Sequence, residues 1–219
     1  MSVTLAGKCR PEPEALHEVR ELGFDAIELQ LLATHLDAFE RSLAAAERSD
    51  LDIVSVHTPH RTLEAPEYFS LADAFAAELD ATLVVHSKHL QHVHIPEFEA
   101  LDFDADYAYE NNPGCSRYHI ENLILNEGHD LVLDTAHLYM AESEYLVALE
   151  TLLRKHLESV PVVHLSDSTR LRDGLSFGSG TVDLDRTVAL IEQLYDGVVV
   201  LEVHPPTAQA EARGRFLDR

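Results

Sequence analysis

Eight short apolar runs recur along the chain, and most of them end in a His, an Asp or a Glu. The runs are Val3–Gly7, Asp25–Leu31, Asp52–His57, Thr82–His86, Asp106–Glu110, Asp130–Asp134, Pro161–Ser166 and Val198–Glu202. Stretches with helical periodicity separate most of them. Alternating strands and helices are typical of a parallel sheet, and eight such units predict an α/β fold of the (β/α)8 TIM barrel type.

Between the runs, apolar residues recur at steps of three and four, which is the period of an amphipathic helix. The helices predicted in this way cover Pro13–Leu22, His35–Ser49, Tyr68–Leu79, Glu142–His156 and Leu184–Tyr195. We find no hairpin signal between strands. His89–Leu101 has little room for a full helix, so one helix of the barrel is expected to be short or missing.

Length and composition limit the domain organisation and the compartment. At 219 residues the chain can form one somewhat shortened barrel, predicted as a single domain over 1–219, because such barrels typically need about 250 residues. No apolar run approaches the ~20 residues of a membrane helix, and the first residues lack the features of a secretory signal. Two cysteines are too few for a disulfide framework. We therefore expect a cytoplasmic protein with Cys9 and Cys115 free, and the number of subunits stays open, a homo-oligomer included.

The charge balance is strongly acidic, with 39 acidic against 16 basic residues and a formal net charge of -23. Such a surface resembles that of proteins from organisms with molar salt in their cytoplasm, because at about 1 M salt the Debye length falls to roughly 3 Å and self-repulsion is screened. The charge therefore indicates a halophilic habitat more than a ligand. It also counts against nucleic-acid binding through a broad basic face.

The ends of the predicted strands carry the residues suited to chemistry. In a (β/α)8 barrel these ends converge on one mouth, so His57, His86, Glu110, Asp134, His164 and Glu202 are expected to face a common point. A carboxylate at the end of a buried strand needs a partner, and a divalent cation can be that partner. Asp134 could instead cap the helix that follows it. The same pattern on four strands favours a metal site.

Three carboxylates and one imidazole, from Glu110, Asp134, His164 and Glu202, form an oxygen-rich donor set. Such a set suits Mn²⁺, Mg²⁺ or Co²⁺ and tolerates Zn²⁺. The sequence therefore predicts one divalent metal ion as cofactor.

Several motifs resemble the xylose-isomerase-like barrel superfamily, which includes sugar phosphate isomerases, sugar epimerases and the endonuclease IV type of nuclease. The resemblance spans nearly the whole chain. Its densest stretches are Ser55-Val-His57-Thr-Pro, Val84-Val-His86, Glu110-Asn-Asn-Pro-Gly, Asp134-Thr-Ala-His137, His164-Leu-Ser-Asp167 and Gly178-Ser-Gly180-Thr-Val-Asp183. It implies a metal held by Glu110, Asp134, His164 and Glu202 in that chain order.

The resemblance also implies a reaction for the two glutamates. In the epimerases of this superfamily they bind the metal and exchange a proton with the substrate carbon beside a carbonyl. The cation polarises the carbonyl and stabilises the enediolate, and a carboxylate on each face can remove or return the proton. Glu110 and Glu202 are thus the expected catalytic residues, with a small sugar or sugar phosphate as substrate. Which glutamate abstracts the proton stays open.

His57 and His86 leave a second interpretation open. A second zinc held by them and bridged through Glu110 would resemble the nuclease pattern and imply phosphodiester hydrolysis at abasic sites. They could equally line the sugar pocket. The third metal position of the nuclease needs His137, an Asp and a His; Asp173 matches, but Leu175 stands where the His is expected. This departure argues against nuclease activity.

Further residues beyond the strand ends are candidates for contact with the substrate. Asp167 belongs to the motif after the seventh predicted strand, and Arg170, Arg172 and Lys88 could contact a phosphate or carboxylate. Arginines on barrel loops are also common partners in surface ion pairs. The glycines of Gly178-Ser-Gly180 could present N–H groups to an anion or simply form a turn. A barrel that binds sugar or metal without turnover is the remaining alternative.

Overall fold

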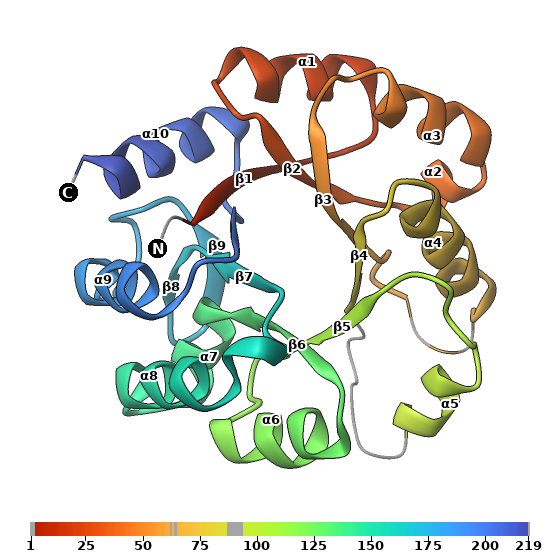
Figure 1. Cartoon of the computed structure of the whole chain (residues 1–219). Helices are drawn as coiled ribbons and strands as arrows, with labels where there is room; N and C mark the ends of the chain where they lie inside the picture. The colour runs from red at the N-terminus through yellow and green to blue at the C-terminus, as the bar shows by residue number, and fades with distance from the viewer. Residues whose placement is uncertain (1–2, 62, 64, 87–93, 219) are drawn as a thin grey trace.

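Eight parallel strands close into a barrel in the computed structural model, which describes residues 3–61, 63, 65–86 and 94–218 (Figure 1). Around the barrel the hydrogen-bonded order is β1-β10-β7-β6-β5-β4-β3-β2. The predicted (β/α)8 TIM barrel is confirmed. Its strands are β1 (Thr4–Cys9), β2 (Ala26–Gln30), β3 (Asp52–His57), β4 (Thr82–Val85), β5 (Tyr107–Glu110), β6 (Asp130–Asp134), β7 (Val162–Leu165) and β10 (Val198–Leu201).

Helices surround the barrel and cover its outer face (Figure 1). They are α1 (Pro13–Glu21), α2 (Ala33–Leu36), α3 (Phe39–Glu47), α4 (Glu67–Glu78), α5 (Ile95–Glu99), α6 (Arg117–Leu123), α7 (Thr135–Ala141), α8 (Tyr145–His156), α9 (Leu184–Leu194) and α10 (Pro206–Leu217). Single 3₁₀ turns follow α6 and α8, at Leu125–Glu127 and Leu157–Ser159. Within the described ranges, no helix is long and apolar enough to cross a bilayer.

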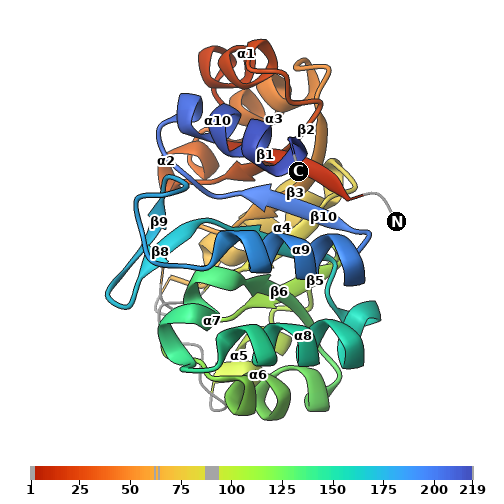
Figure 2. The same cartoon turned by 90° about the vertical axis from the view of Figure 1, so that its left-hand side faces the viewer.

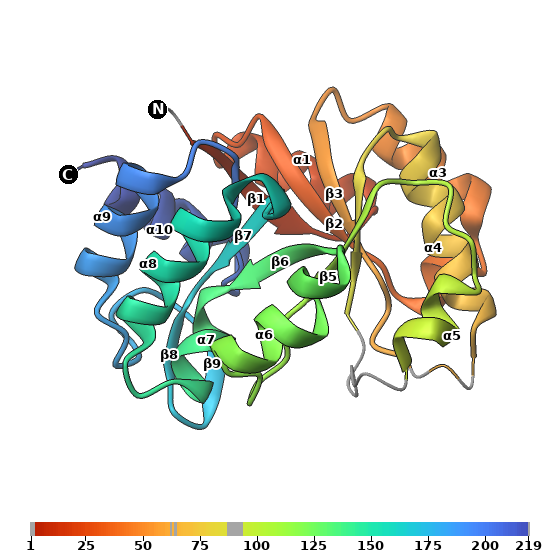
Figure 3. The ribbon, with the colours of Figure 1, turned by 60° about the horizontal axis from the view of Figure 1, so that its bottom comes forward.

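The helix between β4 and β5 is short, as the sequence predicts. α5 has five residues and lies between α4 and α6 around the ring (Figure 3). The helix predicted over 35–49 is divided into α2 and α3, with Asp37 and Ala38 between them. The other predicted helices agree with the structure to within a few residues at their ends.

One element contradicts the expectation that the chain has no hairpin. β8 (Asp167–Thr169) and β9 (Arg172–Leu175) pair in antiparallel fashion immediately after β7. The hairpin projects beyond the mouth at which the barrel strands end (Figure 2). Its strands are too short, and its sequence too polar, to produce the alternation by which a hairpin is recognised.

The barrel interior is layered. On seven strands a small apolar residue points inward and these residues form one buried cluster: Ala6, Ala26, Val84, Ala108, Val132, Val162 and Val200. A larger core lies between the sheet and the helices. Because side chains alternate across a strand, the residue two positions after each apolar one also points inward, one layer closer to the mouth. This second layer contains the candidate site.

Candidate functional site

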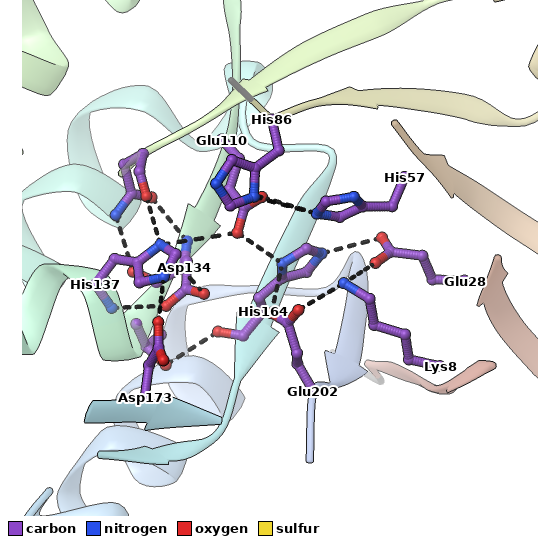
Figure 4. A network of polar contacts seen from close by, with 12 residues as sticks. Lys8, Glu28, His57, His86, Glu110, Asp134, His137, His164, Asp173 and Glu202 are labelled. Atoms are coloured by element: carbon purple, nitrogen blue, oxygen red, sulfur yellow. Dashed lines mark hydrogen bonds and ion pairs between the residues drawn. The ribbon is translucent and has the colours of Figure 1, made fainter. Parts of the chain in front are cut away.

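The second inward layer is almost entirely polar. Two positions after the apolar layer stand Lys8, Glu28, His86, Glu110, Asp134, His164 and Glu202. Most of these side chains are buried. They face one another at the centre of the mouth, where Figure 4 shows a continuous network of polar contacts. The strand ends therefore do converge as the sequence predicts.

Four of these residues form the predicted metal-ligating set. One ligand atom from each of Glu110, Asp134, His164 and Glu202 lies within 4.8 Å of all the others. His164 stands at the centre, with Nδ1 at 3.3 Å from Glu110 Oε1 and 3.1 Å from Glu202 Oε2. Glu110, Asp134 and His164 are at most 3% exposed. Three carboxylates close together, two of them buried, require positive charge among them.

The orientation of His164 indicates where that positive charge belongs. Its Nε2 lies 3.0 Å from Glu28 Oε2 and donates its proton there, so Nδ1 faces two carboxylate oxygens. Burial alone would lower the pKa of His164, but the charges of Glu28 and Glu202 raise it well above its ordinary value. Nδ1 must therefore carry either a proton or a cation. A divalent ion fits this position, because a metal-ligating His characteristically donates its other N–H to a carboxylate.

Of the two roles that the sequence leaves open for Asp134, the structure shows the helix cap and leaves one oxygen that could bind a metal. Its Oδ1 accepts the backbone N–H of His137 at 2.7 Å and so caps α7. The amide of Asn111 holds the Asp134 backbone on both sides, which fixes the strand end. Its other oxygen, Oδ2, is left to the site. Burial raises the pKa of the Asp134 carboxyl to about 6, although His137 opposes the rise.

Glu110 and Glu202 stay ionised in this environment. Burial would raise the pKa of each, but the pKa of Glu110 lies well below its ordinary value because of His86 and His164. Lys8 and His164 do the same for the pKa of Glu202. The side chain of Glu202 is 22% exposed, against 1% for Glu110. Glu202 is thus the glutamate that solvent reaches more easily.

Histidines from the N-terminal half of the barrel gather on the other oxygen of Glu110. Oε2 lies 2.7 Å from His86 Nδ1 and 3.1 Å from His57 Nε2. His60, which the sequence reasoning overlooked, completes a second group of three whose ligand atoms lie within 4.8 Å of one another. Burial, with His57 and His86 nearby, lowers the pKa of His60 to about 4. A neutral imidazole is the form that binds a metal.

His137 and Asp173 meet as the nuclease interpretation expects. His137 Nε2 lies 2.8 Å from Asp173 Oδ2, and Nδ1 donates to the Asn111 carbonyl at 2.7 Å. The third position is occupied by Leu175 in β9, whose side chain has no ligand atom. Both nitrogens of His137 are thus engaged by the protein, and the pair lacks its third ligand, the nitrogen of a second histidine.

Comparison with known proteins places the barrel in a family. The sequence matches the xylose isomerase-like TIM barrel family over residues 107–219, just over half of the chain. The chain belongs to this family. A sequence comparison with curated proteins gave no match.

Solved structures resemble this xylose isomerase-like barrel over its full length. A D-tagatose 3-epimerase-like protein aligns with a TM-score of 0.76 at 19% identity, covering 97% of both chains. A 3-keto-D-glucoside 4-epimerase from E. coli gives 0.73 at 15% identity over 100% of both. An AP endonuclease of family 2 from Brucella melitensis gives 0.71 at 15% identity over 99% of both. At these identities the likeness concerns the fold alone.

Asp167 plays a part that its sequence context did not indicate. Its carboxylate accepts backbone N–H groups from Ser168, Gly178, Gly180 and Val182 at 2.8–3.2 Å. The anion bound by the glycine-rich turn is therefore Asp167 itself. Gly180 is required there, because a Cβ at this position would collide with Asp167 and Ser168. Both oxygens of Asp167 are occupied by this loop.

The basic candidates lie away from the ligand set or outside the described residues. Arg170 stacks on the Tyr139 ring at 4.0 Å and donates to the carbonyls of Tyr139 and Glu142. Arg172 is exposed on the hairpin. Lys88 lies outside the described residues. The two cysteines are free, as predicted, and burial raises the pKa of Cys9 to about 12.

Two site residues of this xylose isomerase-like barrel were missed from the sequence. Lys8 and Glu28 are buried and contact the metal-ligating set directly. Their signal is present in the chain, because each follows an inward alanine by two residues, as Glu110 follows Ala108. Neither residue is the last of its apolar run, because Lys8 directly follows Val3–Gly7 and Glu28 lies inside Asp25–Leu31.

Proposed function

We propose that this chain is a metal-dependent isomerase or epimerase acting on a small polyhydroxylated carbonyl compound, a sugar or sugar phosphate. The observation that carries the proposal is the convergence of three carboxylates and His164, with one ligand atom of each within 4.8 Å of the others and with Glu110 and Glu202 facing His164 Nδ1. Three carboxylates and one imidazole form a mostly hard donor set, which suits Mn²⁺, Mg²⁺ or Co²⁺ and tolerates Zn²⁺.

The glutamates supply the proton-transfer groups. Glu110, Asp134, His164 and Glu202 would hold a divalent ion, which would supply Lewis acidity toward the carbonyl of a bound substrate. Glu110 and Glu202 are both held ionised, which is the form that accepts a proton. They come from β5 and from the end of β10, on either side of His164 (Figure 4). Each proton transfer contributes about 10²–10⁴-fold to the rate.

The names of the structural neighbours guide the choice of substrate. Two of them are described as a 3-keto-D-glucoside 4-epimerase and a D-tagatose 3-epimerase-like protein. Both names refer to sugars with a carbonyl beside the carbon that is inverted. Free ketohexoses, their phosphates and keto-glucosides are therefore the first compounds to test on this chain.

Two measurements test the proposal. Elemental analysis of protein purified in molar salt is expected to give one Mn, Co or Mg per chain. Incubation with a ketose panel in D₂O is then expected to place deuterium on the carbon beside the carbonyl of the compound that is turned over. A metal-loaded protein that exchanges no proton in any of these compounds would contradict the proposal. It would favour a barrel that binds sugar or metal without turnover.

A second candidate function is phosphodiester hydrolysis, and the His57, His60 and His86 cluster favours it. His57 Nδ1 donates to the Thr58 carbonyl, so the unprotonated Nε2 faces a carboxylate oxygen of Glu110. A cation between the two acceptors would relieve their repulsion. Two or more zinc ions per chain, together with cleavage of DNA at an abasic site, would establish this function in place of the first.

A further inference from the structure

A buried ion pair lies beside the ligand set and belongs to none of the roles described above. Lys8 Nζ is 2.8 Å from Glu28 Oε1 and 2.6 Å from Glu202 Oε1. The side chain of Lys8 is 1% exposed and that of Glu28 is 0% exposed. In Figure 4 the pair stands beside His164 and Glu202, on the side away from Asp134.

The backbone of Lys8 is fixed on both edges, by the side chain of Gln209 and by β2. β1 pairs with β10 only as far as Ala6, so the edge of Lys8 that faces β10 has no strand partner. The buried amide of Gln209 replaces it, accepting the Lys8 N–H and donating to the Lys8 carbonyl at 2.8 Å each. On the other edge Lys8 is in register with Glu28. The ammonium therefore sits between β2 and the end of β10.

Each member of the pair controls one atom of a metal-ligating residue. Glu28 Oε2 receives the Nε2 proton of His164 and the Ser55 hydroxyl at 2.7 Å, which leaves His164 Nδ1 free for the site. Lys8 binds Oε1 of Glu202, which leaves only Oε2 to face His164 Nδ1 at 3.1 Å. The two contacts together determine that His164 turns Nδ1, and Glu202 turns Oε2, toward the candidate metal site.

Stability alone is a poor explanation for this pair. Two buried charges lose their hydration, and apolar residues of similar volume are often equally or more stabilising. Groups that hold metal ligands through hydrogen bonds, in contrast, typically change metal affinity or activity by about 10–100-fold when they are replaced. The contacts of Lys8 and Glu28 reach two ligands at once.

We propose that Lys8 and Glu28 are positioning residues for the metal centre, which fix His164 to bind through Nδ1 and Glu202 to bind through Oε2 alone. The inference rests on the proposed function only in that it requires a divalent ion at the four-residue site. Its test uses metal binding and not turnover.

The double variant Lys8→Met/Glu28→Gln separates positioning from charge, because it removes one positive and one negative group and keeps the net charge of the mouth. We expect it to fold and to bind Co²⁺ at least about tenfold more weakly than the unchanged chain. The d–d absorption of bound Co²⁺ should also change, because Glu202 is then free to bind with both oxygens. Ser42→Ala, which removes the buried hydrogen bond to the His35 carbonyl, is the matched control and should change neither.

The outcomes are distinguishable. Unchanged Co²⁺ affinity and spectrum in the folded double variant would overturn the positioning role and leave the proposed function standing. A wild-type protein that binds no Co²⁺, Mn²⁺ or Zn²⁺ would overturn both the positioning role and the proposed function. If the double variant does not fold, Ser55→Ala decides, because it removes one of the two donors to Glu28 Oε2 without altering any charge. Ser55→Ala is expected to weaken Co²⁺ binding by about tenfold, and wild-type binding would overturn the proposal.

Discussion

The two halves of the barrel mouth are built from different chemistry. The half formed by β5, β6, β7 and β10 contributes Glu110, Asp134, His164 and Glu202, a set dominated by oxygen. The half formed by β1 to β4 and the residues that follow them contributes one ammonium, one carboxylate and three imidazoles. They are Lys8, Glu28, His57, His60 and His86.

Glu110 belongs to both halves and joins them. Its Oε1 faces His164, whereas its Oε2 faces His57 and His86. The family match covers residues 107–219, which includes only the carboxylate half. The carboxylate half thus brings together an oxygen-rich group of side chains that could hold a metal ion. The N-terminal half supplies Lys8 and Glu28, which contact Glu202 and His164, and the histidines that line the remainder of the mouth.

The largest expected effect concerns proton transfer by the carboxylate half. Glu202→Gln should keep the fold but lower kcat on an established sugar substrate by about 10²–10⁴-fold, because the amide cannot accept the proton. Turnover in molar salt and far-UV circular dichroism measure the two quantities. Full activity in this variant would contradict the proton-transfer scheme.

Metal content distinguishes the two halves directly. Asp134→Asn should raise the dissociation constant for Mn²⁺ or Co²⁺ by more than about tenfold, because one charged ligand is lost. His60→Gln should leave one such ion per chain. Elemental analysis after dialysis measures both. Loss of that ion from the His60 variant, with retention in the Asp134 variant, would reverse the assignment of the halves.

A smaller effect is expected from His137, whose pKa is raised to about 10 by Asp134 and Asp173 although burial opposes the rise. Because the folded pKa lies above the ordinary value of about 6.5, the stabilisation is fully present below pH 6.5 and is lost as pH rises through about 10. Metal-free His137→Gln should therefore unfold about 4 °C below the unchanged chain at pH 7, and this gap should close near pH 10.5.

Thermal unfolding at several pH values in molar salt measures this gap. Exposed charges are screened there, but the buried His137 contacts are screened much less. A gap that widens with rising pH would contradict the assigned direction of the His137 pKa.

The smallest effect is expected at Leu175. Leu175→His supplies the third ligand, a second histidine nitrogen, next to His137 and Asp173, but position 175 lies outside the set that carries the proposed proton transfer. Sugar turnover should change by less than about twofold, in line with a partly exposed substitution away from the reacting groups. A large gain of cleavage at abasic sites in this variant would instead favour the nuclease lineage.

Much of the fold could be predicted because its signals are local. Each barrel strand is a short apolar run and each longer helix has its own period, so neither requires knowledge of a partner. The convergence of Glu110, Asp134, His164 and Glu202 also followed, because parallel strands of a closed barrel end at one mouth. The β8–β9 hairpin was not predicted, since its short polar strands carry no alternation of apolar and polar residues. The single domain, the cytoplasmic location and the halophilic origin stay predictions.

The barrel and the kinds of side chain at its mouth could be predicted from the chain alone, because apolar periodicity and strand-terminal residues are properties of neighbours in the chain. The partners of those side chains depend on how distant strands come together in space. Lys8 and Glu202 are 194 residues apart in sequence and 2.6 Å apart in space. Asp167 meets the N–H groups of Gly178 and Gly180 only after the loop folds back. Such pairings arise when the barrel closes, since closure alone brings β1 beside β10.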